Sequence, residues 1–113
     1  RFFAASSRAL RFQRPASPAH CQHNAHMYAI RLRDLAQRSA FIAHLKSHGI
    51  HSVFHYVPLH SAPQGKRLGR CHGILAVTER EAERLVRLPL WLGLEAHLEH
   101  VQAAIDGFVP SRP

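Results

Sequence analysis

Apolar and polar residues alternate in the segment HMYAIRL at residues 26–32, which places Tyr28, Ile30 and Leu32 on one face. A period of two is typical of a strand with one face against a core. The segment therefore predicts a strand.

After Arg33 the apolar spacing changes to the three-and-four spacing of an amphipathic helix. The segment RDLAQRSAFIAHLKSHGI at 33–50 predicts a helix that begins after Asp34, with Gln37 three residues later as a capping-box partner. Gly49 is placed to end it in a left-handed turn. The stripe expected to be buried consists of Leu35, Phe41, Ile42 and Leu45.

A second strand is predicted in HSVFHYVPL at 51–59, which is rich in aromatic and β-branched residues. Pro58 has no N–H to donate to a ladder, so the strand stops there or lies at an edge. Residues 61–77 carry Pro63 and three glycines and predict a loop.

The C-terminal third predicts helix, strand and helix. Thr78 and Glu81 form a second capping-box pattern that would open a short helix. The segment RLPLWL at 87–92 is expected to be extended, because Pro89 disfavours helical backbone at Leu88. The residues expected to be buried in these elements are Ala82, Leu85, Val86, Leu88, Leu90, Trp91, Leu94, Leu98, Val101, Ile105 and Phe108.

This order of elements predicts an α+β fold of short strands packed with about three helices. Residues 1–23 are basic and contain no acid, since the first acidic residue is Asp34. We expect 1–23 to be an irregular basic linker or a remnant of a preceding domain, and 24–113 to be one small domain. Because the first residue is Arg1, we expect the sequence to be a piece of a longer protein.

Composition adds a strong positive charge. The formal net charge is +8, and every cation except Lys46 and Lys66 is an arginine. Such a balance favours anionic partners, although an arginine-rich composition can also follow from a GC-rich genome. Two cysteines make no disulfide framework, which indicates a reducing, cytoplasmic setting, and no apolar run is long enough to cross a membrane.

Two clusters carry possible ligand chemistry. His20, Cys21, His23 and His26 crowd into HCQHNAH, but no second pair with zinc spacing follows, so we expect no metal site. The loop PQGKRLGRCHG could approach a phosphate, yet it lacks the P-loop order and reads more simply as a solvated surface loop. Nucleic-acid binding would rest on charge alone, and we expect none.

The segment HYVPLH at 55–60 carries two imidazoles and a tyrosine hydroxyl, which is more polar groups than a strand that only fills a core would need. Tyr56 and His60 are therefore candidate site residues. Judged on the residues alone, the favoured alternative is that Tyr56 packs in the core with its hydroxyl on a backbone carbonyl.

Three blocks together carry a family resemblance: NAHMYAIRLRDLAQRSAFIAHLKSHGI, VFHYVPLHSAPQGKRLGRCHG and TEREAERLVRLPLWLGLE. In order and spacing they resemble the C-terminal part of the DegT/DnrJ/EryC1/StrS sugar aminotransferases, over roughly Pro15 to Phe108. The sequence departs from the family pattern at Ala29, Leu68 and Cys71, where aromatic residues are usual.

The resemblance implies the small C-terminal domain of a fold type I, pyridoxal 5'-phosphate (PLP) dependent aminotransferase, with antiparallel strands. In such enzymes the lysine that holds PLP lies in the large domain, and neither Lys46 nor Lys66 stands in a matching context. We therefore expect PLP to be bound by the full-length enzyme and not by this fragment, which would be inactive alone. The implied partners are a nucleotide sugar, an amino donor, the large catalytic domain and a second subunit.

The resemblance also implies a substrate-binding role for Tyr56 and His60, at the mouth of the active site. With the resemblance taken into account, substrate binding and core packing are equally favoured interpretations of Tyr56. Asn24 and His26 are further substrate-binding candidates, with structural capping of the strand entry as their alternative. A non-catalytic binding or regulatory module derived from the same domain is the second reading of the whole chain.

Overall fold

The computed structural model describes residues 12–13, 16–22 and 24–110. In that part of the chain no helix is long and apolar enough to cross a membrane. The elements in chain order are β1 (Tyr28–Arg31), α1 (Leu35–Ser47), β2 (Val53–Phe54), α2 (Pro63–Leu68), α3 (Ala76–Arg84), β3 (Leu85–Leu88), the 3-10 helix η3 (Leu94–His97) and α4 (Leu98–Asp106).

The three strands form one antiparallel sheet in the order β1-β3-β2. Tyr28 lies opposite Leu88 at one end of the β1–β3 pair, and Arg31 lies opposite Leu85 at the other. Central strand β3 is the last to appear in the sequence, so the sheet closes only when distant segments meet. The predicted α+β fold with short antiparallel strands is confirmed.

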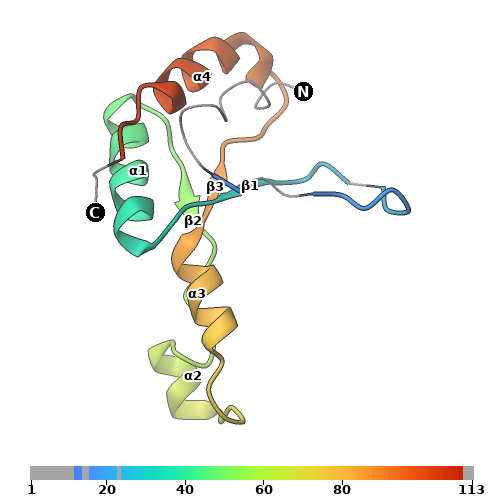
Figure 1. The fold of residues 1–113 in the computed structure, drawn as a ribbon, viewed down its shortest axis with the longest axis vertical. Coiled ribbons are helices and arrows are strands. Elements are labelled where there is room, and N and C mark those ends of the chain that lie inside the picture. The colour runs from blue at the N-terminus through green and yellow to red at the C-terminus, as the bar shows by residue number, and fades with distance from the viewer. Residues whose placement is uncertain (1–11, 14–15, 23, 111–113) are drawn as a thin grey trace.

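One face of the sheet is covered by α1 and α4, and the core lies between them and the strands (Figure 1). The ring of Phe41 is fully buried, edge-on to Phe12 at 5.8 Å and to Phe108 at 5.1 Å between centroids. Burying such a side chain contributes about 1.5–3 kcal/mol. The core consists of Ile30, Leu32, Phe41, Leu45, Ile50, Val86, Leu88, Leu94, Val101, Ala104, Ile105 and Phe108.

Helix α1 begins and ends where the sequence predicts. The Asp34 carboxylate accepts a hydrogen bond from the Gln37 N–H at 2.8 Å, and the Gln37 amide oxygen accepts from the Arg33 N–H at 2.7 Å. Gly49 has a φ of 73°, the left-handed conformation that glycine adopts without cost. The prediction for Leu35 was wrong: it is 42% exposed, because the first residue of the helix faces away from the sheet.

Helices α2 and α3 with their connection, residues 63–84, form what we call the arm, which extends away from the core (Figure 1). Neither helix has a fully buried residue. The prediction of an irregular loop at 61–77 was wrong, because Pro63 starts α2 at a position where its missing N–H is not needed. The described residues therefore contain four α-helices, of which α2 is the one that the sequence does not predict.

The predicted capping box at Thr78 was also wrong. Helix α3 begins at Ala76, so Thr78 lies inside its first turn, and Leu75 caps the helix without a side-chain bond. Leu85 and Val86 belong to β3 and not to this helix. The predicted second strand is shorter than 51–59, since only Val53–Phe54 pair with β3.

Gly65 is the point where α2 approaches the turn after β2. A Cβ built at Gly65 would lie 1.6 Å from the carbonyl oxygen of Leu59. No side chain fits in that space, so glycine is needed here for close backbone packing and not for an unusual φ.

The segment after β3 is more exposed than predicted. Leu90 and Trp91 are 45% and 50% exposed, although both are predicted to be buried, whereas Leu88 at the end of β3 is buried as expected. Leu92, for which the sequence makes no prediction, is 98% exposed. Gly93 has a φ of 95°, and the Leu94 N–H donates to the Trp91 carbonyl oxygen at 3.3 Å. This tight turn pushes Leu92 into solvent and brings Trp91 next to η3.

Candidate functional site

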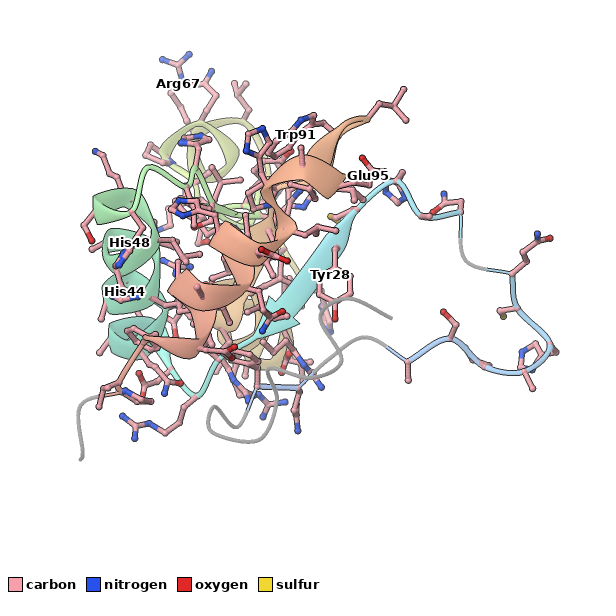
Figure 2. All side chains as sticks on the ribbon, turned by 90° about the horizontal axis from the view of Figure 1, so that it is seen from above. Tyr28, His44, His48, Arg67, Trp91 and Glu95 are labelled. Atoms are coloured by element: carbon pink, nitrogen blue, oxygen red, sulfur yellow. The ribbon has the colours of Figure 1, made fainter. Side chains whose placement is uncertain are left out.

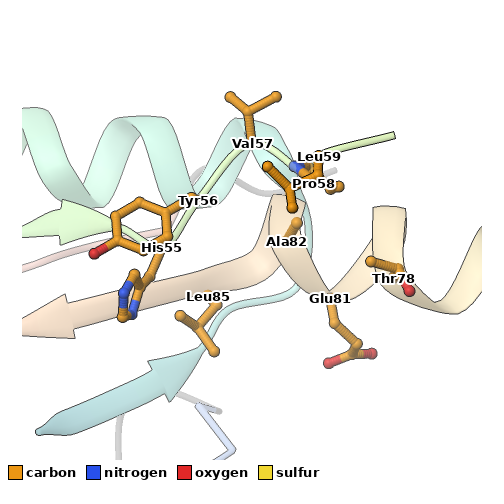
Figure 3. Close-up of a pocket in the computed structure, with 9 residues that line it drawn as sticks. All are labelled: His55, Tyr56, Val57, Pro58, Leu59, Thr78, Glu81, Ala82 and Leu85. Atoms are coloured by element: carbon orange, nitrogen blue, oxygen red, sulfur yellow. The ribbon is translucent and has the colours of Figure 1, made fainter. Parts of the chain in front are cut away.

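A hollow of about 370 Å³ lies where the HYVPLH segment passes over the start of β3 and the end of α3 (Figure 3). One wall comes from the segment after β2 and the other from α3 and β3. The residues that line it are His55, Tyr56, Val57, Pro58, Leu59, Thr78, Glu81, Ala82 and Leu85.

Tyr56 lines this hollow and is 65% exposed. Its ring meets the His55 ring edge-on at 3.8 Å between centroids (Figure 3). Within the described residues its hydroxyl makes no hydrogen bond. The alternative of a core tyrosine bonded to a backbone carbonyl therefore does not describe this residue, and its hydroxyl is available to a ligand.

His60 lies apart from the hollow. Its Nε2 atom is 2.8 Å from the Glu79 carboxylate at the start of α3, and its side chain is 18% exposed. A carboxylate at this distance neutralises a protonated imidazole and repels an approaching phosphate. In this arrangement His60 fastens the HYVPLH segment to α3, and its direct substrate role stays a prediction.

Asn24 and His26 are exposed, and Nδ1 of His26 donates a hydrogen bond to the Asn24 side-chain oxygen at 2.5 Å. Neither lines the hollow. The charge of His26 does reach the His55 imidazole, so the fold brings part of the first predicted pair close to the HYVPLH segment.

His55 sits among cations. Partial burial lowers its pKa below the usual value, and the positive charges of Arg87 and His26 lower it further. Arg87 lies opposite both Ala29 and Val53 in the sheet, and His55 follows Val53 by two residues, just after β2 ends. The His55 imidazole therefore lies close to the Arg87 guanidinium and to His26.

Sequence reasoning missed His55 and Arg87 as candidates. Their signal was present: in LVRL the inward residues are Val86 and Leu88, so Arg87 had to face outward. The sequence alone did not indicate that β3 pairs with β2, and this pairing brings Arg87 close to His55.

Glu81 is the acidic member of the lining. Its carboxylate accepts a hydrogen bond from the Arg31 guanidinium at 2.7 Å, with Arg84 and Arg80 at 3.5 and 3.3 Å. The bond from Arg31 lowers the Glu81 pKa below its usual value. Glu81 is therefore committed to joining β1 and α3, and it offers little free negative charge to a ligand.

The remaining candidate ligands do not converge. In the part of the chain that the structure describes, no three His, Cys, Asp or Glu side chains are placed to hold a metal ion, and His23 of the HCQHNAH cluster lies outside that part. Lys46 lies in the last turn of α1 and Lys66 in α2. Neither lysine lines the hollow, so the described residues do not offer an amine to a PLP aldehyde there.

A family model of the DegT/DnrJ/EryC1/StrS aminotransferases matches residues 4–106. The chain belongs to this family. The match begins before Pro15, where we expected the resemblance to start.

Several solved structures have a similar fold. A DegT DnrJ EryC1 StrS aminotransferase from Brucella abortus is 29% identical, with a TM-score of 0.72 over 94% of this chain. DesV of S. venezuelae, solved in complex with a ketimine intermediate, is 22% identical with a TM-score of 0.77 over 92% of the chain. Spr1654 of Streptococcus pneumoniae, assigned as a sugar aminotransferase and solved in a PLP form, is 20% identical with a TM-score of 0.62 over 93%.

The chain spans only a small part of these proteins. It covers 29% of the Brucella and Streptococcus chains and 28% of DesV. At 20–22% identity the DesV and Spr1654 likenesses establish the fold alone.

Proposed function

We propose that this chain is the C-terminal part of a PLP-dependent sugar-nucleotide aminotransferase. The reaction moves an amino group from an amino acid, glutamate in our proposal, to a dTDP-4-keto-6-deoxy-hexose. The enzyme closest to this in chemistry is dTDP-4-amino-4,6-dideoxygalactose transaminase, which serves lipopolysaccharide and enterobacterial common antigen synthesis. Family membership supports the reaction type.

The observation that carries the substrate assignment is the unbonded, exposed Tyr56 hydroxyl at a largely apolar hollow, next to His55 and the Arg87 guanidinium. Val57, Pro58 and Leu59 offer an apolar surface to the methyl side of a 6-deoxy sugar. Tyr56 can bind a sugar hydroxyl or a phosphate oxygen. Arg87 supplies positive charge for a diphosphate, and the neighbouring His55 imidazole can take up a proton when the anion binds.

PLP would supply the electron sink of the transamination when bound to the complete enzyme. Because the two lysines lie away from the hollow, we assign no cofactor contact to this chain. In our proposal the large domain holds PLP, and this chain binds the nucleotide sugar and keeps water away from the reacting atoms. The domain limits 1–23 and 24–113, the homodimer and the cytoplasmic location belong to the same proposal.

The first test measures binding by the 113-residue chain. We expect dTDP to raise the pKa of His55, followed by NMR of its ring protons, because a nearby anion stabilises the protonated imidazole. Arg87→Gln should weaken this binding about tenfold, as expected for the loss of a charge-assisted bond. Lys46→Gln removes one charge at a distance and is the matched control. An unchanged His55 pKa at saturating dTDP would contradict the assignment.

The second test measures turnover. The chain alone should show no transamination of a dTDP-4-keto-6-deoxy-hexose in a glutamate-coupled assay, and turnover by the chain alone would refute our division of labour. In the complete enzyme Tyr56→Phe should raise KM more than it lowers kcat, since the hydroxyl binds ground state and transition state alike.

A non-catalytic binding module is the second candidate function. It is favoured because the residues that line the hollow offer a binding surface but include no lysine. It predicts dTDP binding with no turnover even when the chain is joined to the PLP-binding domain of a relative. Turnover by that chimera would favour the enzyme.

A further inference from the structure

A second hollow, of about 440 Å³, lies at the opposite end of β3 from the Tyr56 hollow and shares no residue with it. It forms where the turn after α1, the segment after β3 and the start of α4 meet. The lining residues used below are His51, Pro89, Trp91, His97, His100 and Val101.

Trp91 is the single tryptophan of the chain, and it is half exposed where the sequence predicts a core residue. Its ring lies 6.2 Å from the His97 ring, at an interplanar angle of 39°. The Gly93 turn and the hydrogen bond from Leu94 N–H to the Trp91 carbonyl fix this pair. The indole is thus held at the edge of the second hollow and is not packed into the core (Trp91 is labelled in Figure 2).

The titratable groups of the lining are all imidazoles. His100 donates through Nε2 to the His48 carbonyl oxygen at 2.8 Å, which ties α4 to the end of α1 and orients that ring. His51 and His97 make no hydrogen bond or ion pair with the described residues, so their nitrogens are available. Among the described lining residues there is no carboxylate.

The size of this hollow falls within the range of small-molecule sites, which are mostly apolar with a few polar groups. Pro89 and Val101 supply apolar walls, and Trp91 supplies a face for stacking. Two unbonded imidazoles in a lining that contains no carboxylate favour a negative substituent, as does the formal charge of +8 on the chain.

We propose that this hollow is a second binding site, which takes a planar aromatic ring carrying a carboxylate or phosphate. Trp91 stacks on the ring, and His51 and His97 donate hydrogen bonds to the anionic group. The site is independent of the nucleotide-sugar assignment at Tyr56.

The test uses the indole N–H of Trp91, the only such NMR signal of the 113-residue chain. Two aromatic anions are titrated, adenosine monophosphate and 2-naphthoate, each against its neutral partner, adenosine and 2-naphthol. We expect a saturable shift with a Kd of about 1 mM or tighter for at least one anion, and at least about tenfold weaker binding of its neutral partner. Which anion binds tells whether the ligand is a nucleotide or an aromatic acid.

Variants locate the binding. His51→Ala and His97→Ala change exposed positions and should each weaken the anion about tenfold, while His72→Ala in the arm and Tyr56→Phe should leave it unchanged. Far-UV circular dichroism checks that each variant folds. The proposal is overturned if neither anion shifts the indole signal saturably, if neutral partners bind equally well, or if His51→Ala and His97→Ala both bind like the parent chain.

Discussion

The two halves of the molecule are held together by different means. The layered half, built from the sheet, α1 and α4, contains every residue of the buried core. The arm contains none of these residues, and it exposes Leu68 by 73%, Ile74 by 93% and Val77 by 64%. One half carries its own core, whereas the other is a short extension of the sheet.

The difference shows that stability and ligand binding depend on different parts of this fold. The arm is attached by polar contacts, chiefly His60 with Glu79 and Arg31 with Glu81, and by the close approach at Gly65. Polar surface contacts contribute far less than a core does. The arm nevertheless supplies one wall of the Tyr56 hollow, so binding there depends on the less stable half.

The largest effect is expected from the core. Phe41→Ala removes a fully buried ring between two other rings and should lower the free energy of unfolding by about 3–5 kcal/mol. Leu68→Ala in the arm should change it by less than about 0.5 kcal/mol. Urea denaturation of both variants, followed by circular dichroism, measures the contrast. Equal losses would show that the arm shares the core's stability.

Gly65→Ala should affect the arm and the adjoining HYVPLH segment, and leave the core unchanged. The new methyl meets the Leu59 carbonyl oxygen, so α2 must shift away from the turn, at a cost of about 1–3 kcal/mol. Hydrogen exchange should show faster exchange of amides in α2 and the HYVPLH segment, with the amides of α1 unchanged. Gln64→Ala, at the exposed neighbouring position, is the control. Unchanged protection in α2 would contradict the close approach.

Glu79→Gln removes the charge that pairs with His60. We expect the free energy needed to open the arm to fall by about 0.5 kcal/mol. The effect is small because the ion pair is partly exposed to water. Protection of the amides at the start of α3 measures this. Glu83→Gln, one turn along the same helix and exposed, leaves the pair with His60 intact and should have a smaller effect on the start of α3, because the Glu83 charge acts on Arg38 of α1. Equal responses of the two variants would mean that helix charge, and not the ion pair, holds the arm.

The smallest effect is a pH dependence. The Glu81 pKa is lowered in the folded state, chiefly by the bond from Arg31, so its contribution is present above its ordinary value of 4.5 and is lost as pH falls through the lower folded value. The urea midpoint should therefore fall as pH is lowered below 4.5, and less steeply in Glu81→Gln. Asp34, whose pKa is lowered chiefly by the Gln37 N–H, contributes in the same direction and stays in both proteins. Identical pH profiles of the two proteins would show that Glu81 does not contribute to the pH dependence of stability.

The layered half could largely be predicted from the sequence. Its strands and helices follow alternation and three-and-four spacing, and the α1 ends follow from Asp34 and Gly49. Those signals are local, so they survive without knowledge of the tertiary structure. The same reasoning failed in the arm, where Thr78 and Glu81 match a capping box but Glu81 bonds to Arg31 on a distant strand.

The candidate site was predictable only in part. Tyr56 was identified and is exposed at the hollow, but His60 faces Glu79, and His55 and Arg87 were missed. Whether two side chains share a face depends on strand order and register, which a single sequence does not specify. Trp91 was predicted to be buried because it is a large aromatic residue, but it is half exposed next to the left-handed turn at Gly93.

Helix α3 passes into β3 without an intervening residue, since Arg84 ends the one and Leu85 begins the other. The backbone of the central strand therefore fixes the direction in which α3 leaves the sheet. Because the same strand leads on to Pro89 and Trp91, one four-residue segment connects the arm, both edge strands and the second hollow.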